Sequence, residues 1–501
     1  MLRQFTKNLS SNWVVYFSAA LLSFFLTPFI IDHLGQAAYG VWVLVGAFSG
    51  YLGLFDFGLG FGVVRYVARY QETGEIRRRN QIVATAFYLS SMLAILVLAA
   101  TAILAMQAPG WFAIPPDIIA GARAVIILIG IAVAFGFPLS IFSEALAGGL
   151  YRFDLFNMVA VATGFLRAGL IVAFLYMGWG LTGLGLAALI GISIGYIWRL
   201  ILLYRKLPNL SIKPSLMNRE SLKQLGGYSI YSFLIVLSGR LAFYSDSFIV
   251  GAVRGVADVA IFGIAARLAE YLRQLVFTMT KLFTPMVARF DADTDRKIMR
   301  RIFYDGSRIN MLFALPLSLG LFFWGGDLIS LWVGDDFKNA ATILQVLLAG
   351  HLIAFVPGVG AEILVGAGRH KTLAWMSLSA AVSNIILSLI LIKPLGLVGV
   401  AWGTTIPLLA LSLLYLPAAV ISSINGKTGE FFINAALRPL GATVIPLILM
   451  VYFSGHLDTI HKMIAVSLLT VGVYLPGAWW VGLKAAERRK IMDMIKSRNL
   501  N

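Results

Sequence analysis

The chain has 501 residues, of which 59% are hydrophobic and only 13% are charged. A soluble domain carries about 25% charged residues, so this composition excludes a soluble protein and predicts many membrane spans. The formal net charge of +17 suggests nucleic acid as a partner. The basic residues, however, gather in loops on alternate sides of the predicted spans, which is the positive-inside pattern of membrane proteins and argues against nucleic acid.

The chain has no cysteine and only five histidines, which are scattered. Disulfides, thiolate metal sites and cysteine nucleophiles are therefore excluded, and we expect no metal and no cofactor. Basic residues precede the first apolar run, as they do in a signal peptide. That run is about 20 residues long and belongs to a repeated unit, so we expect a retained first helix.

Fourteen stretches are apolar enough and long enough to cross the ~30 Å hydrocarbon core as helices. In chain order they are 11–31, 39–64, 81–106, 119–147, 154–177, 181–204, 226–252, 256–286, 307–333, 340–366, 372–392, 397–423, 431–454 and 463–483. The connections after the second, sixth and eighth stretches each hold five Lys or Arg, whereas 32–38, 107–118 and 178–180 hold none. We therefore predict that the even-numbered connections and both termini are cytoplasmic.

The two halves of the chain share landmarks at nearly constant separation. The pairs are Arg69 and Arg289 (220 residues apart), Pro138 and Pro357 (219), Glu144 and Glu362 (218), and Gly180 and Gly396 (216). Chance similarity of apolar sequence would not keep one offset so steadily. The unit is six helices repeated once, and because six is even the two copies have the same orientation in the membrane.

The repeat predicts an all-α polytopic membrane protein of about 14 transmembrane helices, with two parallel-repeat six-helix lobes and a terminal helix pair. Residues 1–218 form the first lobe and 219–425 the second. Residues 426–501 hold the last two helices and a basic amphipathic tail, for which we expect a place on the anionic inner leaflet or a protein partner. Two such lobes facing each other are the architecture of a rocking transporter.

Arginines inside the predicted spans are the first candidates for a binding site, because charge within a membrane is costly. The guanidinium fork binds phosphate in a bidentate way and stays charged. A cavity with these side chains would attract an anionic headgroup. Alternatively, carboxylates of the protein neutralise them: Glu270 in the helix of Arg267 and Arg273, Asp246 for Arg240, and Asp56. The candidates are Arg167, Arg240, Arg267 and Arg273.

The internal carboxylates are candidates for binding a coupling proton or cation: Asp56, Asp246 and Glu270. Asp56 precedes a run of glycines, and it could equally accept backbone N–H bonds and lock an unwound segment there. The paired positions Pro138 and Glu144, and Pro357 and Glu362, suggest gates or hinges. The simpler alternative for the two glutamates is a structural role, capping neighbouring helices, which the symmetry favours.

The first two predicted helices contain LTPFIIDHLGQAAYGVWVL and GLFDFGLGFGVVRYVARY. Together with the fourteen-helix plan, these stretches resemble the polysaccharide and oligosaccharide flippases of the multidrug/oligosaccharidyl-lipid/polysaccharide exporter superfamily, which include O-antigen and exopolysaccharide repeat-unit translocases. The resemblance implies a V-shaped cavity that opens to each side in turn and moves a polyprenyl-diphosphate-linked glycan outward. It also implies that Arg65 and Arg69 meet the diphosphate at the cytoplasmic mouth, and that the last two helices offer a groove to the lipid tail.

The resemblance places the chain in the bacterial inner membrane, as a transporter and not an enzyme. Its implied partners are the lipid-linked glycan, membrane lipids, H⁺ or Na⁺ as coupling ion, and polysaccharide polymerase machinery. A multidrug cation antiporter of the same superfamily is the alternative, although organic cations need an anionic cavity and the internal charge here is mostly basic. A membrane glycan ligase or polymerase would need a large outer loop with catalytic residues, and no predicted outer loop is large.

Overall fold

The computed structural model describes residues 2–287, 296–485, 487–489 and 492–493. Every regular element in these ranges is a helix, which agrees with the predicted all-α fold. The repeat landmark Arg289 and the tail residues Ile491, Met494 and Ile495, expected on one apolar face, lie outside the described residues.

The contacts within the chain group it into two compact units, Met1–Ala260 and Ile261–Asn501. The helix that was expected to open the second lobe, residues 226–252, therefore makes its contacts within the first unit. The division of the repeat at residue 218 remains a prediction about sequence symmetry.

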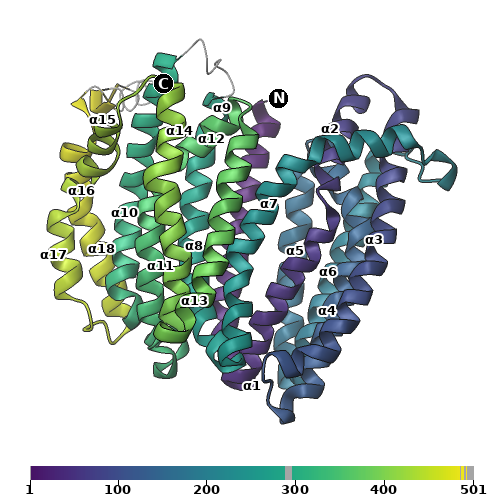
Figure 1. Ribbon diagram of the computed structural model, residues 1–501, viewed down its shortest axis with the longest axis horizontal. Helices are drawn as coiled ribbons and strands as arrows, with labels where there is room; N and C mark the ends of the chain where they lie inside the picture. The colour runs from purple at the N-terminus through teal and green to yellow at the C-terminus, as the bar shows by residue number, and fades with distance from the viewer. Residues whose placement is uncertain (1, 288–295, 486, 490–491, 494–501) are drawn as a thin grey trace. The chain divides into compact units, whose positions relative to one another are not determined.

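The first unit is a helical bundle in which α4 packs against both α3 and α6, and α5 packs against α6 and α1. Figure 1 shows α3, α4, α5 and α6 running side by side. The elements are α1 (Leu2–Leu52), the 3₁₀ turn η1 (Gly53–Asp56), α2 (Leu59–Glu72), α3 (Ile76–Trp111), η2 (Pro116–Ile118), α4 (Ile119–Glu144), the π-helical turn η3 (Ala145–Gly149), α5 (Phe153–Tyr176), α6 (Gly180–Lys206), η4 (Pro214–Leu216), α7 (Arg219–Arg254) and the start of α8 (Val256–Thr280).

The second predicted span, 39–64, is not one continuous helix. Its first part continues α1 across a kink at Gly35, where φ is 77°. The helix then ends at Leu52, and after the η1 turn both Phe57 (φ 48°) and Gly58 (φ 77°) take left-handed conformations before α2 begins. Glycine adopts this conformation without a Cβ clash, so Gly58 permits the break. Irregular backbone at membrane depth is tolerated where it is covered by protein or lines a cavity.

Close packing at one end of the bundle fixes α2 against the turn that follows α4. Val63 and Val67 of α2 and Ile141 of α4 are completely buried in one apolar cluster. A Cβ at Gly149 would lie only 2.6 Å from Cγ1 of Val67, so a glycine is needed for η3 to approach α2 this closely. This packing holds the end of α4 beside the broken segment.

The second unit consists of the rest of α8 and the helices that follow it. They are η5 (Lys281–Phe283), α9 (Thr284–Val287), α10 (Arg296–Val333), η6 (Asp335–Phe337), α11 (Ala340–Phe355), α12 (Gly358–Gly366), α13 (His370–Ala410), η7 (Leu411–Tyr415), α14 (Leu416–Ser423), α15 (Thr428–Phe432), η8 (Ile433–Leu437), α16 (Arg438–Ala442), α17 (Val444–Tyr452), α18 (Ile460–Gly477) and η9 (Ala478–Gly482). The predicted spans 372–392 and 397–423 join through α13, with a non-helical Gly396 (φ 59°) between them.

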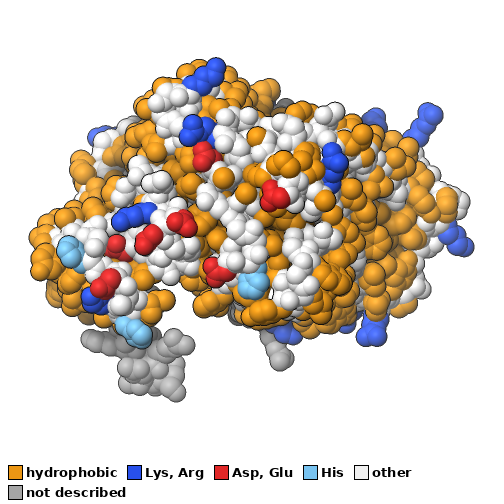
Figure 2. Space-filling view, turned by 90° about the horizontal axis from the view of Figure 1, so that it is seen from below, with side chains coloured by type: hydrophobic (Ala, Val, Ile, Leu, Met, Phe, Trp, Pro, Cys, Tyr) orange, Lys and Arg blue, Asp and Glu red, His pale blue; other side chains and the backbone are white. Residues whose placement is uncertain are grey.

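Within the described residues, nine helical segments are long and apolar enough to cross a membrane, or up to eleven if each of two bent pairs is one span. The segment Ser11–Asp56 alone contains most of two predicted spans. The multi-pass membrane fold is therefore confirmed, and the number fourteen remains a prediction. Figure 2, which views the protein from below, shows hydrophobic side chains over much of the visible surface.

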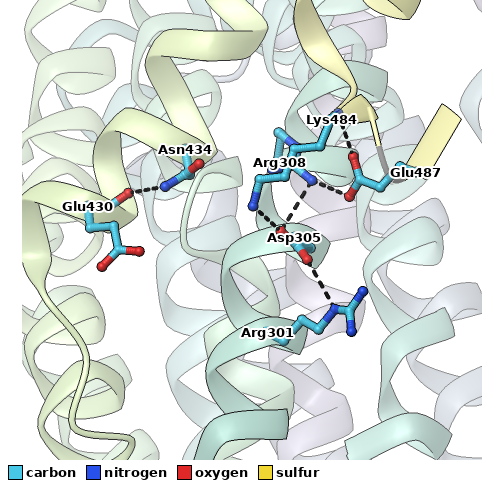
Figure 3. A network of polar contacts seen from close by, with 7 residues as sticks. All are labelled: Arg301, Asp305, Arg308, Glu430, Asn434, Lys484 and Glu487. Atoms are coloured by element: carbon cyan, nitrogen blue, oxygen red, sulfur yellow. Dashed lines mark hydrogen bonds and ion pairs between the residues drawn. The ribbon is translucent and has the colours of Figure 1, made fainter.

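A cluster of charges surrounds one fully buried arginine in the second unit (Figure 3). The side chain of Arg308 in α10 is 0% exposed, and its Nη2 lies 3.2 Å from Oδ1 of Asp305. The same nitrogen donates to Glu487, in the segment after the last helix. Lys484 from that segment donates to Asp305 at 2.9 Å. These ion pairs attach the segment to α10.

Candidate functional site

A cavity of about 530 Å³ lies inside the first unit. It is lined by residues of α1, η1, α2, α4, α5, α6 and α7, and small side chains such as Ser49, Gly136 and Gly191 leave the space open. Five charged side chains line it: the acidic Asp56 and Glu144, and the basic Arg167, Arg199 and Arg240. Three guanidinium groups against two carboxyl groups make the cavity suited to an anion.

The broken segment after α1 positions the first carboxyl group. The backbone N–H of Gly60 donates to Oδ2 of Asp56 at 3.5 Å, a long hydrogen bond. The second carboxyl group, Glu144, comes from the end of α4. A Cβ at Gly60 would lie 3.2 Å from Cγ of Glu144 and 3.9 Å from Oδ2 of Asp56. The two carboxyl groups therefore flank one glycine, and the lack of a side chain there lets them approach.

Arg167 extends from α5 into the cavity, and its side chain is exposed there. Its Cβ lies against α6, where a Cβ at Gly191 would be only 3.1 Å away. Among the described residues Arg167 makes no hydrogen bond or ion pair. Its guanidinium keeps five N–H donors for a ligand.

Arg240 reaches the cavity from α7. Its Nη1 donates to the hydroxyl of Tyr244 at 3.2 Å, and its guanidinium carbon lies 5.6 Å from that ring's centroid. Asp246, which was considered as its partner, is 4% exposed and does not line the cavity. Asp246 instead lies within electrostatic range of Tyr51 in α1.

Arg199 was not singled out from the sequence, yet it lines the cavity together with Tyr196 of the same helix. Its guanidinium carbon lies 4.0 Å from the ring centroid of Phe156, and its Nε is buried without a hydrogen-bond partner in the described structure. A signal was present: Gly191, Gly195 and Arg199 recur every four residues on one face of α6. Small residues on the face that carries an internal arginine leave room for a cavity.

Other predicted site residues of the first unit lie elsewhere. Arg65 and Arg69 are on α2 and do not line the cavity; each guanidinium lies about 6 Å from the ring of the tyrosine that follows it. Pro138 is inside α4, between the lining residues Phe137 and Ser140.

The remaining candidates belong to the second unit. In α8, Arg273 forms a bidentate ion pair with Glu270, with both N–O distances 2.6 Å. Arg267 is on the same helix, and Pro357 and Glu362 lie at the start and inside of α12. The structure thus brings Asp56, Glu144, Arg167 and Arg240 together in one cavity and leaves these five outside it. No group of three His, Asp or Glu side chains that could hold a metal occurs among the described residues.

Comparison with known proteins identifies the family. Residues 5–291 match the family model described as "Polysaccharide biosynthesis protein", and residues 232–390 match the MatE model. The chain belongs to the polysaccharide biosynthesis protein family. This match covers more than half of the chain, including every residue that lines the cavity.

Two curated relatives and two solved structures are similar over most of their length. The chain is 24% identical to "Uncharacterized membrane protein EpsK" of Bacillus subtilis, with 98% of each chain covered. It is 23% identical to "Putative O-antigen transporter" of Shigella flexneri, over 82% of this chain and 97% of that protein.

The lipid II flippase MurJ in an inward closed conformation has a TM-score of 0.69 at 15% identity, with 95% of this chain and 98% of MurJ covered. An inward-facing multidrug resistance MATE transporter has a TM-score of 0.66 at 16% identity, with 82% and 95% covered. These likenesses show that the chain shares the fold of MurJ and of the MATE transporter.

Proposed function

We propose that this chain is a flippase that moves a polyprenyl-diphosphate-linked oligosaccharide from the cytoplasmic to the outer leaflet by alternating access. The observation that carries the proposal is the cavity of the first unit, where Arg167, Arg199 and Arg240 converge on one space. A diphosphate is the anionic part of such a substrate, and three guanidinium groups can bind its oxygens in a bidentate way. The names of two similar proteins, an O-antigen transporter and a lipid II flippase, support this substrate class.

The lipid tail needs an apolar surface. The second unit contains an apolar cavity of about 380 Å³ lined by residues of α10, α11 and α17, among them Phe322, Leu352 and Leu447. Since α17 belongs to the terminal helices outside the repeat, this cavity supports the expectation that those helices receive the polyprenyl chain.

The membrane potential drives the proposed step in the right direction. Moving negative charge out of an inside-negative cell releases about 2.3 kcal/mol per charge per 100 mV. We further propose that Asp56, beside Glu144 in the cavity, exchanges H⁺ or Na⁺ during the cycle. From the basic connections we infer that both termini are cytoplasmic. The family supports a bacterial inner membrane as the location and polysaccharide polymerase machinery as the recipient of the flipped glycan.

The test is export in a strain whose own copy of the gene is deleted. Arg167→Ala and Arg240→Ala should each reduce extracellular polysaccharide by at least about thirtyfold, because each removes charged hydrogen bonds to a desolvated diphosphate. Lipid-linked repeat units should accumulate on the cytoplasmic leaflet, and membrane levels of the protein should be unchanged. Arg123→Ala is the matched control, since Arg123 is exposed on α4 and does not line the cavity. Full export by both cavity variants would contradict the proposal.

The MatE match over residues 232–390 favours one second candidate, a multidrug cation antiporter. The same strain distinguishes the two functions by ethidium efflux. A flippase leaves ethidium efflux unchanged when the gene is deleted, whereas an antiporter loses efflux and keeps polysaccharide export.

A further inference from the structure

Arg199 makes a close contact with the aromatic ring of Phe156. The guanidinium carbon of Arg199 lies 4.0 Å from the centroid of the Phe156 ring, compared with 5.6 Å or more for Arg65, Arg69 and Arg240 and their tyrosines. This distance is well within the ~6 Å range of cation–π interactions. A cation held on an aromatic face away from water is strongly attracted, and the contact uses none of its N–H donors.

The donors of Arg199 are consequently available. Its Nε is buried and has no hydrogen-bond partner in the described structure. Burying an N–H without an acceptor is unfavourable, and an oxygen-rich ligand in the cavity would relieve that cost. The Nε–H of Arg199 is therefore left without an acceptor among the described residues and can donate to an anion in the cavity.

Two groups of the protein itself compete for this cation. The carboxyl group of Glu144 is within electrostatic range of Arg199, and so is the hydroxyl group of Tyr196 one turn earlier on α6. Yet no ion pair joins Glu144 and Arg199 in the described structure. Opposite charges in a site shielded from water attract each other strongly. Two aromatic rings lie near the guanidinium carbon of Arg199, that of Phe156 at 4.0 Å and that of Tyr196 at 5.9 Å, so Phe156 makes the closer contact.

The chain connects the two opposing groups through a short, well-fixed segment. Glu144 ends α4, the π-helical turn η3 follows, and Phe156 lies in the first turn of α5. Gly148 and Gly149 pack η3 tightly against α2, where a Cβ would meet Val64 or Val67 at less than 3 Å. The positions of Glu144 and Phe156 are thus set relative to each other by the same packing.

We propose that Phe156 is a positioning residue that holds Arg199 off Glu144, so that the guanidinium of Arg199 binds the phosphoryl oxygens of the substrate instead of the internal carboxylate. The proposal rests on the proposed function, and it explains how the guanidinium of Arg199 stays available to a diphosphate in the same cavity. Without the ring, Arg199 pairs with Glu144, and the diphosphate loses one of its three cationic partners.

The test measures binding of undecaprenyl diphosphate to the purified full-length protein in nanodiscs. Phe156→Leu should weaken binding by about tenfold, because removal of a desolvated cation–π contact lets Arg199 turn to Glu144. Phe156→Trp should restore the affinity, since tryptophan offers the strongest cation–π face. The decisive variant is the double substitution Phe156→Leu with Glu144→Gln, which should bind several times more tightly than Phe156→Leu alone because the competing carboxylate is gone. A purely structural role for Phe156 would give no such rescue.

Phe165→Leu is the matched control, because this phenylalanine of α5 is 56% exposed and lies outside the cavity lining; it should bind like the wild type. Wild-type affinity in Phe156→Leu, or a double variant as weak as Phe156→Leu, would overturn the positioning role alone. If Arg199→Ala, Arg167→Ala and Arg240→Ala all bound undecaprenyl diphosphate as the wild type does, the proposed function would fail, and the positioning role with it.

Discussion

The cavity of the first unit and the charge cluster of the second unit use arginine in opposite ways. Arg167 faces open space and has no ion pair among the described residues. Arg308, in contrast, is completely buried and pairs with Asp305 and Glu487. In the first arrangement the charge is available to a ligand, whereas in the second two carboxylates of the protein neutralise it. An arginine inside a membrane protein therefore points to a binding site when no carboxylate of the protein pairs with it.

Arg273 of α8 resembles Arg308, because its guanidinium is also paired with a carboxylate of the protein, that of Glu270. The bidentate geometry of this pair satisfies the fork of Arg273, and Gln274 donates a further hydrogen bond to Glu270 at 2.7 Å. The structural alternative considered for these residues matches this geometry. The proposal that they bind substrate consequently has less support than the one for Arg167, Arg199 and Arg240.

The largest effect on stability should come from breaking the buried cluster. Glu487→Ala removes one carboxylate from the fully buried Arg308 and should lower the free energy of unfolding by about 1–3 kcal/mol, because the guanidinium loses one of its two carboxylate partners and keeps Asp305. Thermal unfolding of the purified protein in detergent measures the change. Arg167→Ala is the matched comparison, and it should leave the unfolding temperature nearly unchanged. Equal losses in both variants would remove the distinction between the two regions.

A smaller effect on export should follow from filling the cavity without touching a charge. A Cβ at Gly136 would lie 2.6 Å from Cε2 of Tyr196, so Gly136→Ala displaces that ring towards the space beside Arg199. We expect polysaccharide export to fall by about threefold to tenfold, because displacing one uncharged side chain should cost less than the ~100-fold loss that a misplaced reacting group can cause. Gly169→Ala is the control, because a Cβ there meets nothing within 4 Å. Unchanged export in Gly136→Ala would show that the substrate does not use this part of the cavity.

The smallest effect concerns an exposed ion pair of the second unit, before α18. Lys462 donates a hydrogen bond to Asp458 at 2.9 Å and holds the pKa of that carboxyl below its ordinary value of 3.8. A lowered pKa stabilises the folded state above the ordinary value, and the stabilisation is lost as the pH falls through and below it. Asp458→Asn should hardly change the unfolding temperature at pH 7, because water screens an exposed pair. The same substitution should remove the slight decline in unfolding temperature that the wild type shows below about pH 4. A large fall in the unfolding temperature at pH 7 would mean that this exposed ion pair stabilises the protein as much as the ion pairs of the buried Arg308 do.

The sequence predicted the helical membrane fold and four of the five ionisable residues of the cavity. Asp56, Arg167 and Arg240 attracted notice because charge is costly within a span, and Glu144 because the repeat pairs it with Glu362. Their convergence was not predictable, since they come from four separate elements and tertiary packing alone brings them together. The gate or hinge role of Glu144 remains a prediction, and its place beside Asp56 gives it a second possible role.

Arg199 was overlooked because it lies near the end of its predicted span, where an arginine usually reaches the interface. In the cavity Arg199 lies against Phe156, a residue of another helix. No spacing along α6 reveals that contact. The break between α1 and α2 was partly foreseeable from its glycines, but hydropathy alone extended the helix through it. Hydropathy measures how apolar a segment is and does not report whether its backbone is regular.

The central claim is that the cavity of the first unit binds the diphosphate of a lipid-linked glycan, and a single cysteine can test it directly. The chain has no cysteine, so Ser140→Cys places one reactive thiol in the lining, and Ser422→Cys places one on the exposed surface of α14. Alkylation by N-ethylmaleimide is measured with and without undecaprenyl diphosphate. We predict that undecaprenyl diphosphate slows alkylation at position 140, has no effect at position 422, and loses its effect at position 140 when Arg167→Ala is added. Equal alkylation rates at position 140 with and without undecaprenyl diphosphate would contradict the claim.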